Sequence, residues 1–190
     1  RPAADHPPPS PHVPQQALPS VLLASSVDGA ALAWLVPPPE TGTSDPRLER
    51  FLASIGTARP AMLLYVGTTG VYGDTGGATV TEETVVAPGN DRARRRVAAE
   101  AFAQAWCAAA GVRCVVLRVP GIYGPGRLPL DRLRRGEPVL RPEDAGPGNR
   151  IHVDDLVAAC VATLERPAQG LFNVSDGNPA TTTEFAGISP

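Results

Sequence analysis

The chain has 190 residues, of which 43% are hydrophobic, and a formal net charge of −2 at pH 7. This length suffices for one domain with a hydrophobic core, and the near-zero charge argues against a nucleic-acid partner or an anionic membrane surface. The apolar run 21–36 is interrupted by Asp28 and Gly29 and is too short for a membrane span, and no basic segment precedes it, so we expect a cytoplasmic protein without a signal peptide.

Two residue types limit the chemistry. All 17 basic residues are arginine, so no lysine can act as a base, form a Schiff base or anchor a cofactor. Cys107, Cys114 and Cys160 lie far apart in apolar stretches, which indicates buried positions in a reducing compartment and not a disulfide framework. The histidines have no ligand-like spacing either, so we expect no metal site.

The chain begins with a proline-rich segment. Residues 1–20 contain seven prolines and almost no aliphatic side chains, which predicts a disordered leader. The apolar run 31–36 ends at three prolines and predicts a strand buried on both faces. Asp45 and Pro46 then begin a helix that ends at Gly56. Its apolar positions recur at helical spacing, at Leu48, Phe51, Leu52 and Ile55.

The middle of the chain continues this alternation. Residues 62–66 predict a second buried strand and residues 112–119 a third. Between them a helix is expected from about residue 92 to 110, capped by Asn90 or Asp91 and ended by a glycine. Its small residues form one face that we expect to lie on the sheet: Val97, Ala101, Ala105 and Ala108.

The last third predicts a weaker helix over 130–135, a helix capped by Asp154, a short strand over 171–174 and a capping box at 181–184. The helix after Asp154 has one face that holds Leu156, Cys160, Thr163 and Leu164. Strands that alternate with helices indicate a parallel sheet, in which ligands bind beyond the carboxyl ends of the strands. Those ends are expected to carry the loops 37–39, 67–73 and 120–124.

The segment 64–74 is the most informative in the sequence. It places Thr68 four residues before the pair Tyr72-Gly73, directly after a buried strand, although this pattern alone is equally typical of an ordinary turn. Three later segments accompany it, at 117–126, 149–156 and 172–176. Together the four segments resemble the extended short-chain dehydrogenase/reductases, the NAD-dependent epimerase/dehydratase family, and the resemblance extends from about residue 31 to the C-terminus.

The resemblance implies a fold and a set of site residues. The fold is α/β, a Rossmann-like doubly wound parallel sheet over residues 21–190, with a small substrate-side region at about 125–190 and with NAD or NADP as cofactor. In the family, a Ser or Thr at the position of Thr68 hydrogen-bonds the reacting oxygen of a nucleotide sugar or similar small molecule. The nicotinamide side is expected to be lined by Pro37, Pro38, Thr68, Arg96, Pro120, Gly121, Ile122 and Tyr123. The substrate side is expected to include Thr69, Tyr72 and Arg150.

The sequence departs from the family at its catalytic pair. The family places a tyrosine and a lysine four residues apart on the helix after the Thr68 loop, where tyrosinate exchanges the proton and lysine lowers its pKa and binds the ribose. In this sequence those positions hold Arg92 and Arg96, as in an atypical subgroup, so the implied catalytic set is Thr68, Arg92 and Arg96. Guanidinium keeps charge and donors but cannot exchange a proton near neutral pH. A solvated basic turn explains these arginines equally well.

A second departure concerns the cofactor. Family members begin with a glycine-rich turn that binds the pyrophosphate, and no Gly-x-Gly-x-x-Gly spacing occurs in this sequence. Because residues 31–36 correspond to the family's fourth strand, we expect a chain truncated at its N-terminus. Three hypotheses therefore stay open: an NAD(P)-dependent oxidoreductase, epimerase or dehydratase, with homo-oligomer formation undecided; a non-catalytic dinucleotide-binding sensor or scaffold; and an inactive fragment.

Overall fold

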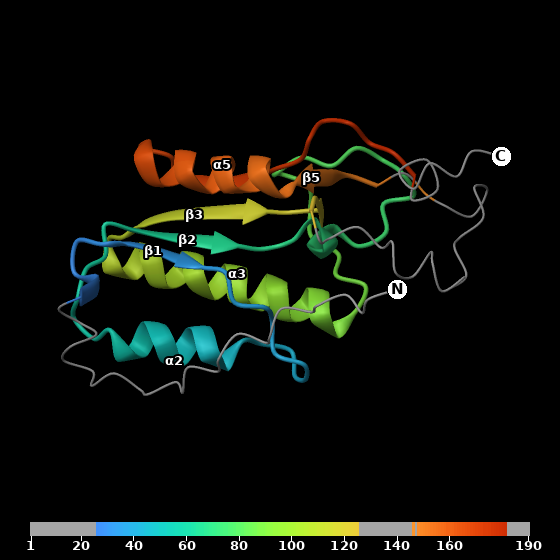
Figure 1. Ribbon diagram of the computed structural model, residues 1–190. Helices are drawn as coiled ribbons and strands as arrows, with labels where there is room; N and C mark the ends of the chain where they lie inside the picture. Colours follow the sequence, from blue (N-terminus) through green and yellow to red (C-terminus); the bar gives the residue numbers. More distant parts are fainter. Residues whose placement is uncertain (1–25, 126–145, 147, 182–190) are drawn as a thin grey trace, which may run out of the picture.

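The computed structural model describes residues 26–125, 146 and 148–181 (Figure 1). The predicted leader at 1–20, the predicted helix at 130–135 and most of the predicted capping box at 181–184 lie outside the described residues. Within them, strands and helices alternate from Ala31 to Arg118 as the sequence predicts, but Gly121–Tyr123 forms a strand where a loop was expected.

The strands form a four-stranded parallel sheet in the order β1-β2-β3-β6 and a separate parallel pair, β4-β5. This confirms the predicted Rossmann-like parallel architecture. The larger sheet consists of β1 (Ala31–Trp34), β2 (Met62–Val66), β3 (Arg113–Arg118) and β6 (Gly170–Asn173). The pair consists of β4 (Gly121–Tyr123) and β5 (Arg150–His152).

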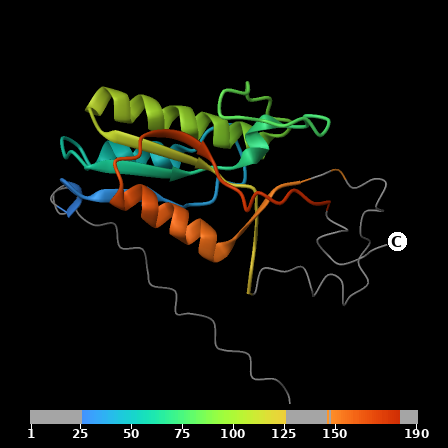
Figure 2. The ribbon, with the colours of Figure 1, turned by 90° about the horizontal axis from the view of Figure 1, so that it is seen from above.

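Helices cover the two faces of the sheet unequally. One face packs against α2 (Pro46–Ser54) and α3 (Asp91–Ala110), and the other against α5 (Val153–Glu165), as Figures 1 and 2 show. A short 3-10 helix, η1 (Thr69–Tyr72), follows β2 at the carboxyl end of the sheet.

Side-chain caps fix where the helices start, because the first backbone N–H groups of a helix lack partners within it. The Asp45 carboxylate accepts from the Arg47 N–H at 3.2 Å, and the Asn90 side chain accepts from Ala93 N–H at 2.9 Å, so both predicted caps are confirmed. The predicted Asp154 cap is wrong. His152, the last residue of β5, has the extended backbone of a cap, and its Nδ1 accepts from the Asp154 N–H at 3.2 Å.

The buried face of α3 differs from the predicted one. Ala101, Ala105 and Ala108 are exposed, whereas Ala99 and Ala103 are buried. The helix itself carries alanines on every face, so the spacing of its small residues does not distinguish one face from another. The larger residues decide the orientation, since Phe102, Trp106 and Cys107 pack in the core formed with α2 and the sheet.

Strand β1 is covered on one face only, which corrects the prediction of a strand buried on both. Leu32 and Trp34 pack into the core with α2 and α3, but Ala31 and Ala33 are exposed and Leu35 is 62% exposed. Among the described residues β1 lies at the edge of the sheet, and α5 covers the two central strands instead. In contrast β2 is buried on both faces, as predicted.

Candidate active site

Backbone hydrogen bonds hold the Thr68 loop against the end of β3. The Gly67 N–H donates to the Leu117 carbonyl at 2.8 Å, and the Thr69 N–H donates to the Val119 carbonyl at 3.1 Å. Thr68 is half-buried and caps η1, because its Oγ accepts from the Gly70 N–H at 3.1 Å. A hydroxyl that accepts in this way still has its proton to donate. The side chain therefore has a fixed position and a usable donor at the carboxyl end of β2.

Arg96 lies at the same end of the sheet. Its Nη1 is 3.4 Å from the Val36 carbonyl, 3.3 Å from the Val66 carbonyl and 3.4 Å from the Tyr65 hydroxyl. Burial raises the pKa of Tyr65, and the Arg96 guanidinium offsets part of that rise. Arg92, one helical turn earlier, is exposed. The structure thus brings Arg96 to the strand ends that carry Thr68 and leaves Arg92 on the surface of α3.

Three arginines hold the loop that follows β1 by its backbone oxygens. Arg47 donates to the Pro37 carbonyl, Arg95 donates to the Gly42 carbonyl at 2.8 Å, and Arg96 contacts the Val36 carbonyl. Arg95 is only 6% exposed, and its Nε has no hydrogen-bond partner within the described part of the chain. Nothing in the spacing of the arginine run 92–96 marked this residue as buried.

A buried polar cluster lies beneath the Thr68 loop. Arg118 donates from Nε to Glu100 Oε2 at 3.1 Å and from Nη2 to Glu100 Oε1 at 2.5 Å. Its Nη1 donates to the Tyr72 hydroxyl at 2.8 Å, and that hydroxyl lies 2.8 Å from Asn173 Oδ1 and 2.9 Å from the Thr81 carbonyl. Burial alone would lower the pKa of Arg118, but the bonds with Glu100 and Tyr72 raise it overall. Tyr72, expected on the substrate side, is 4% exposed and bonded within the protein.

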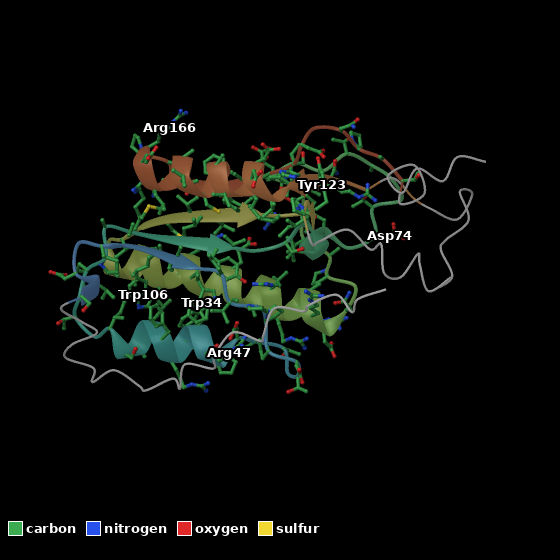
Figure 3. All side chains as sticks on the ribbon, in the orientation of Figure 1. Trp34, Arg47, Asp74, Trp106, Tyr123 and Arg166 are labelled. Atoms are coloured by element: carbon green, nitrogen blue, oxygen red, sulfur yellow. The ribbon has the colours of Figure 1, made fainter. Side chains whose placement is uncertain are left out.

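Most of the remaining predicted residues lie in and around the β4-β5 pair, and Pro38 lies in the loop that follows β1. Gly121, Ile122 and Tyr123 form β4 and pair with Arg150, Ile151 and His152. The Tyr123 ring meets the His152 ring edge-on, with centroids 5.2 Å apart. Desolvation and a hydrogen bond with Asp176 both raise the pKa of Tyr123. Figure 3 shows Tyr123 and Asp74 at the end of the sheet to which the strand arrows point, and Arg166 at the opposite end.

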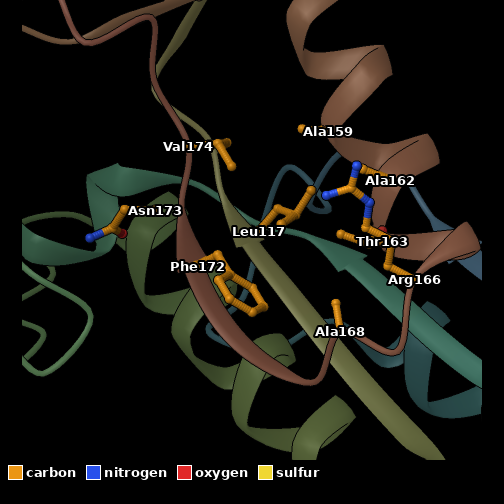
Figure 4. Close-up of a pocket in the computed structure, with 9 residues that line it drawn as sticks. All are labelled: Leu117, Ala159, Ala162, Thr163, Arg166, Ala168, Phe172, Asn173 and Val174. Carbon is orange, nitrogen blue, oxygen red and sulfur yellow. The ribbon is translucent and has the colours of Figure 1, made fainter.

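Other parts of the described structure offer little for catalysis. A cavity of about 280 Å³ lies between α5 and β6 and contains neither Thr68 nor Arg96 (Figure 4). It is lined by Leu117, Ala159, Ala162, Thr163, Arg166, Ala168, Phe172, Asn173 and Val174. In the described ranges no group of His, Cys, Asp or Glu is arranged to hold a metal ion. No helix in those ranges is both long and apolar enough to cross a membrane.

Comparisons with known proteins agree with this architecture. Residues 47–175 match the NAD dependent epimerase/dehydratase family. A solved conserved protein of unknown function from Silicibacter pomeroyi is 34% identical, with a TM-score of 0.68 over 84% of this chain and 58% of that one. The dTDP-glucose 4,6-dehydratase DesIV from Streptomyces venezuelae, solved with NAD bound, is 21% identical, with a TM-score of 0.74 over 89% of this chain and 59% of that one.

Two further relatives are informative. MoeE5, solved with UDP-glucuronic acid and NAD, is 23% identical, with a TM-score of 0.69 over 87% of this chain and 63% of that one. A 3-diazoavenalumate denitrifying reductase from a Streptomyces species is 38% identical over 80 residues, which cover 37% of this chain and 25% of the reductase. The chain therefore spans about three-fifths of the solved relatives it matches. The family match over residues 47–175 and the shared parallel sheet establish that the chain belongs to the NAD-dependent epimerase/dehydratase family.

Proposed function

We propose that this protein acts as an NAD-dependent oxidoreductase of the epimerase/dehydratase type on a nucleotide sugar or similar small molecule. One observation carries the proposal: the Thr68 hydroxyl, fixed by the Gly70 N–H at 3.1 Å, lies at the strand ends that also hold Arg96. Ligands of open parallel sheets bind at this edge. MoeE5, a relative with the same fold, was solved with UDP-glucuronic acid and NAD, which supports the substrate class.

The donor set fits the nicotinamide half of the cofactor. Arg96 lies within 3.4 Å of the carbonyls of Val36 and Val66, so its guanidinium is fixed where the carboxyl ends of β1 and β2 meet. We assign Arg96 to the ribose hydroxyls, because guanidinium donates several hydrogen bonds in a fixed plane. The residues assigned to the rim of the nicotinamide are Pro37, Pro38, Pro120, Gly121, Ile122 and Tyr123. No residue of this sequence supplies the glycine-rich turn for the pyrophosphate.

The chemistry divides between cofactor and protein. When bound, NAD would supply the hydride acceptor for the carbon that carries the substrate hydroxyl. The protein contributes the Thr68 hydrogen bond to the reacting oxygen, and Arg96 and the more distant Arg92 contribute positive charge. Because guanidinium stays protonated near neutral pH, neither arginine accepts the substrate proton, which leaves to water instead. Thr69 and Arg150 are assigned to the substrate side, and Tyr72 to the support of the loop.

A second candidate function is dinucleotide binding without catalysis. Both positions of the family's tyrosine and lysine hold arginine, and Arg92 is exposed. This favours a protein that binds a dinucleotide without turnover, as a sensor or scaffold. A cytoplasmic location and a homo-oligomeric state remain predictions under either function.

One experiment separates the two functions. The purified protein is titrated with NAD and NADP by calorimetry, and turnover of UDP-glucose, UDP-glucuronic acid and dTDP-glucose is followed both by chromatography of the sugar products and by NADH formation. We expect Thr68→Val to lower turnover by about 10²–10³-fold with little change in NAD affinity, because the lost bond is strongest in the transition state. Arg96→Leu should weaken NAD binding.

The control is Thr163→Val, which removes a buried hydroxyl bonded to the Cys160 carbonyl at 2.7 Å on α5. It should leave both measurements unchanged. NAD binding without turnover on any of the three sugars would support the sensor. Turnover that Thr68→Val does not change would remove Thr68 from the mechanism.

A further inference from the structure

Four buried or half-buried side chains from separate elements meet beneath the Thr68 loop. Glu100 comes from α3, Arg118 from the end of β3, Tyr72 from η1 and Asn173 from the end of β6. We call them the Glu100–Arg118 network. We propose that this network is a positioning device that holds the Thr68 hydroxyl in place for the reaction, an inference that rests on the function proposed above.

The network reaches Thr68 through one short turn. Thr68 caps η1, and Tyr72 is the last residue of the same 3-10 helix. The Arg118 guanidinium lies over the Tyr72 ring, 4.8 Å from its centroid, and also donates to the Tyr72 hydroxyl at 2.8 Å. A shift of the Tyr72 ring would therefore move η1 and with it the residue that begins it.

The other end of the loop is fixed by close packing at Gly67. A Cβ on Gly67 would lie 3.2 Å from the Tyr65 ring and 3.7 Å from Glu100 Oε2. The loop thus approaches the network carboxylate closely where it leaves β2, and its backbone is bonded there to the Leu117 carbonyl at 2.8 Å. Because the loop is held at Gly67 and at Tyr72, Thr68 between them has little freedom to move.

The desolvation cost of the Arg118–Glu100 ion pair indicates that the pair positions the loop and does not mainly stabilise the fold. The side chains of Arg118 and Glu100 are 6% and 8% exposed. Replacing a buried pair of this kind by apolar residues of similar volume is often neutral or stabilising, because both charges lose their hydration. Apolar residues cannot supply directional contacts. The ion pair and the contacts of the Tyr72 hydroxyl with Arg118 and Asn173 fix one relative orientation of η1, β3 and β6.

The test uses Tyr72→Phe in the complete chain, which keeps the ring and removes the hydroxyl. Amide hydrogen exchange is measured without ligand at Thr69 and Gly70, whose N–H groups are bonded to the Val119 carbonyl and Thr68 Oγ. We expect exchange there to accelerate about tenfold, the equivalent of one lost hydrogen bond. Exchange in α2 and β1 should not change. In the sugar-conversion assay kcat should fall while the KM of the sugar stays the same.

A pair of variants at Asn173 provides the rescue. Asn173→Asp keeps an oxygen that accepts from the Tyr72 hydroxyl and should behave like the unaltered protein. Asn173→Leu leaves the contacts of that hydroxyl with Arg118 and the Thr81 carbonyl in place, so it should accelerate exchange at Thr69 and Gly70 less than Tyr72→Phe does. Thr163→Val again serves as the buried-hydroxyl control. Unchanged exchange at Thr69 and Gly70 in Tyr72→Phe would overturn the proposal, as would equal acceleration in α2 and β1, which indicates a general loss of stability.

Failure of the proposed function gives a different result. If the unaltered protein shows no turnover but Tyr72→Phe accelerates exchange at Thr69 and Gly70 alone, the network holds the loop and the enzymatic assignment fails. If Thr68→Val abolishes turnover but Tyr72→Phe changes neither exchange nor kcat, the enzyme stands and the network has no positioning role.

Discussion

The two faces of the sheet differ in how completely they are covered. On the face with α2 and α3, Leu48 and Ile55 are 0% exposed and Leu52 is 1% exposed. On the face with α5, Ala31 and Ala33 of β1 are exposed, and on α5 itself Val157 is 56% exposed, Val161 42% and Leu164 38%. We call these the closed face and the open face.

The side chains that organise the candidate site come mainly from the closed face. Arg95, Arg96 and Glu100 all project from α3 and reach the loops at the carboxyl ends of the strands. In contrast α5 contributes apolar contacts to β2 and β3. The comparison suggests that precise placement of polar groups depends on the rigid, fully packed side of the molecule.

The largest expected difference between the faces concerns core packing. Leu52→Ala on the closed face should lower the free energy of unfolding by about 2–5 kcal/mol, because it removes a buried side chain and leaves a cavity. Val161→Ala on the open face should lower it by less than about 1 kcal/mol, because that side chain is already 42% exposed. Urea unfolding of both variants measures the difference, and equal losses would contradict the distinction between the faces.

The helix caps give a second, smaller contrast. Asn90→Ala should cost roughly 1 kcal/mol, since it leaves the Ala93 N–H at the start of α3 without its cap. His152→Asn should cost less, because asparagine also accepts from the N–H of the first helical turn. Thermal unfolding compares the two variants. A larger loss for His152→Asn would show that the ring contact of His152 with Tyr123 outweighs its role as a cap.

A pH-dependent contribution is expected at β6. The Asn173 N–H donates to the Glu82 carboxylate at 2.7 Å and lowers the pKa of Glu82 below its usual 4.5. A depressed pKa in the folded state adds stability above the unfolded pKa, and this stability is lost as the pH falls through the folded pKa. Because Glu82 is exposed, the contribution should stay below about 1 kcal/mol. The difference in urea midpoint between Glu82→Gln and the unaltered protein should be present at pH 7 and vanish in strong acid. A difference that persists in strong acid would exclude the carboxylate as its cause.

The smallest effect on stability is expected at the surface of α5. Val157→Lys should change the free energy of unfolding by no more than about 0.5 kcal/mol. It should nevertheless lower the fluorescence of a dye that binds exposed apolar surface. Ala158→Lys, at the neighbouring exposed position, adds the same charge without removing a large apolar side chain and is the matched control. Equal dye signals from the two variants would mean that Val157 is not part of the exposed apolar surface.

Local signals in the sequence predicted most of the elements. The caps and glycines around 46–54 and 91–110, and the apolar runs of β2 and β3, depend on neighbours within a few residues. The parallel arrangement of the sheet followed from the alternation of strands and helices, whereas the order of its strands was not predicted. These predictions succeeded because the physics that governs them is local.

The contacts of the candidate site were not predictable in the same way. Arg118 lies 18 residues from Glu100 and 46 from Tyr72, and no periodicity relates such distant positions. The arginine run shows the same limit. Arg92 is exposed as a solvated turn requires, but Arg95 is buried because the fold brings the Gly42 carbonyl against it. Sequence spacing predicts on which face of a helix or strand a side chain lies. Its hydrogen-bond partner depends on which distant segment packs against that face.

The arginines that hold the loop after β1 have a consequence for how this family can vary. Arg47, Arg95 and Arg96 contact the carbonyl oxygens of Pro37, Gly42 and Val36, which every amino acid possesses. Substitutions between Pro37 and Gly42 therefore leave these anchors intact, whereas an insertion or deletion would move the oxygens away from all three guanidinium groups. In related sequences that keep arginine at the positions of Arg47, Arg95 and Arg96, the loop 37–42 should vary in amino-acid composition but should keep the same length.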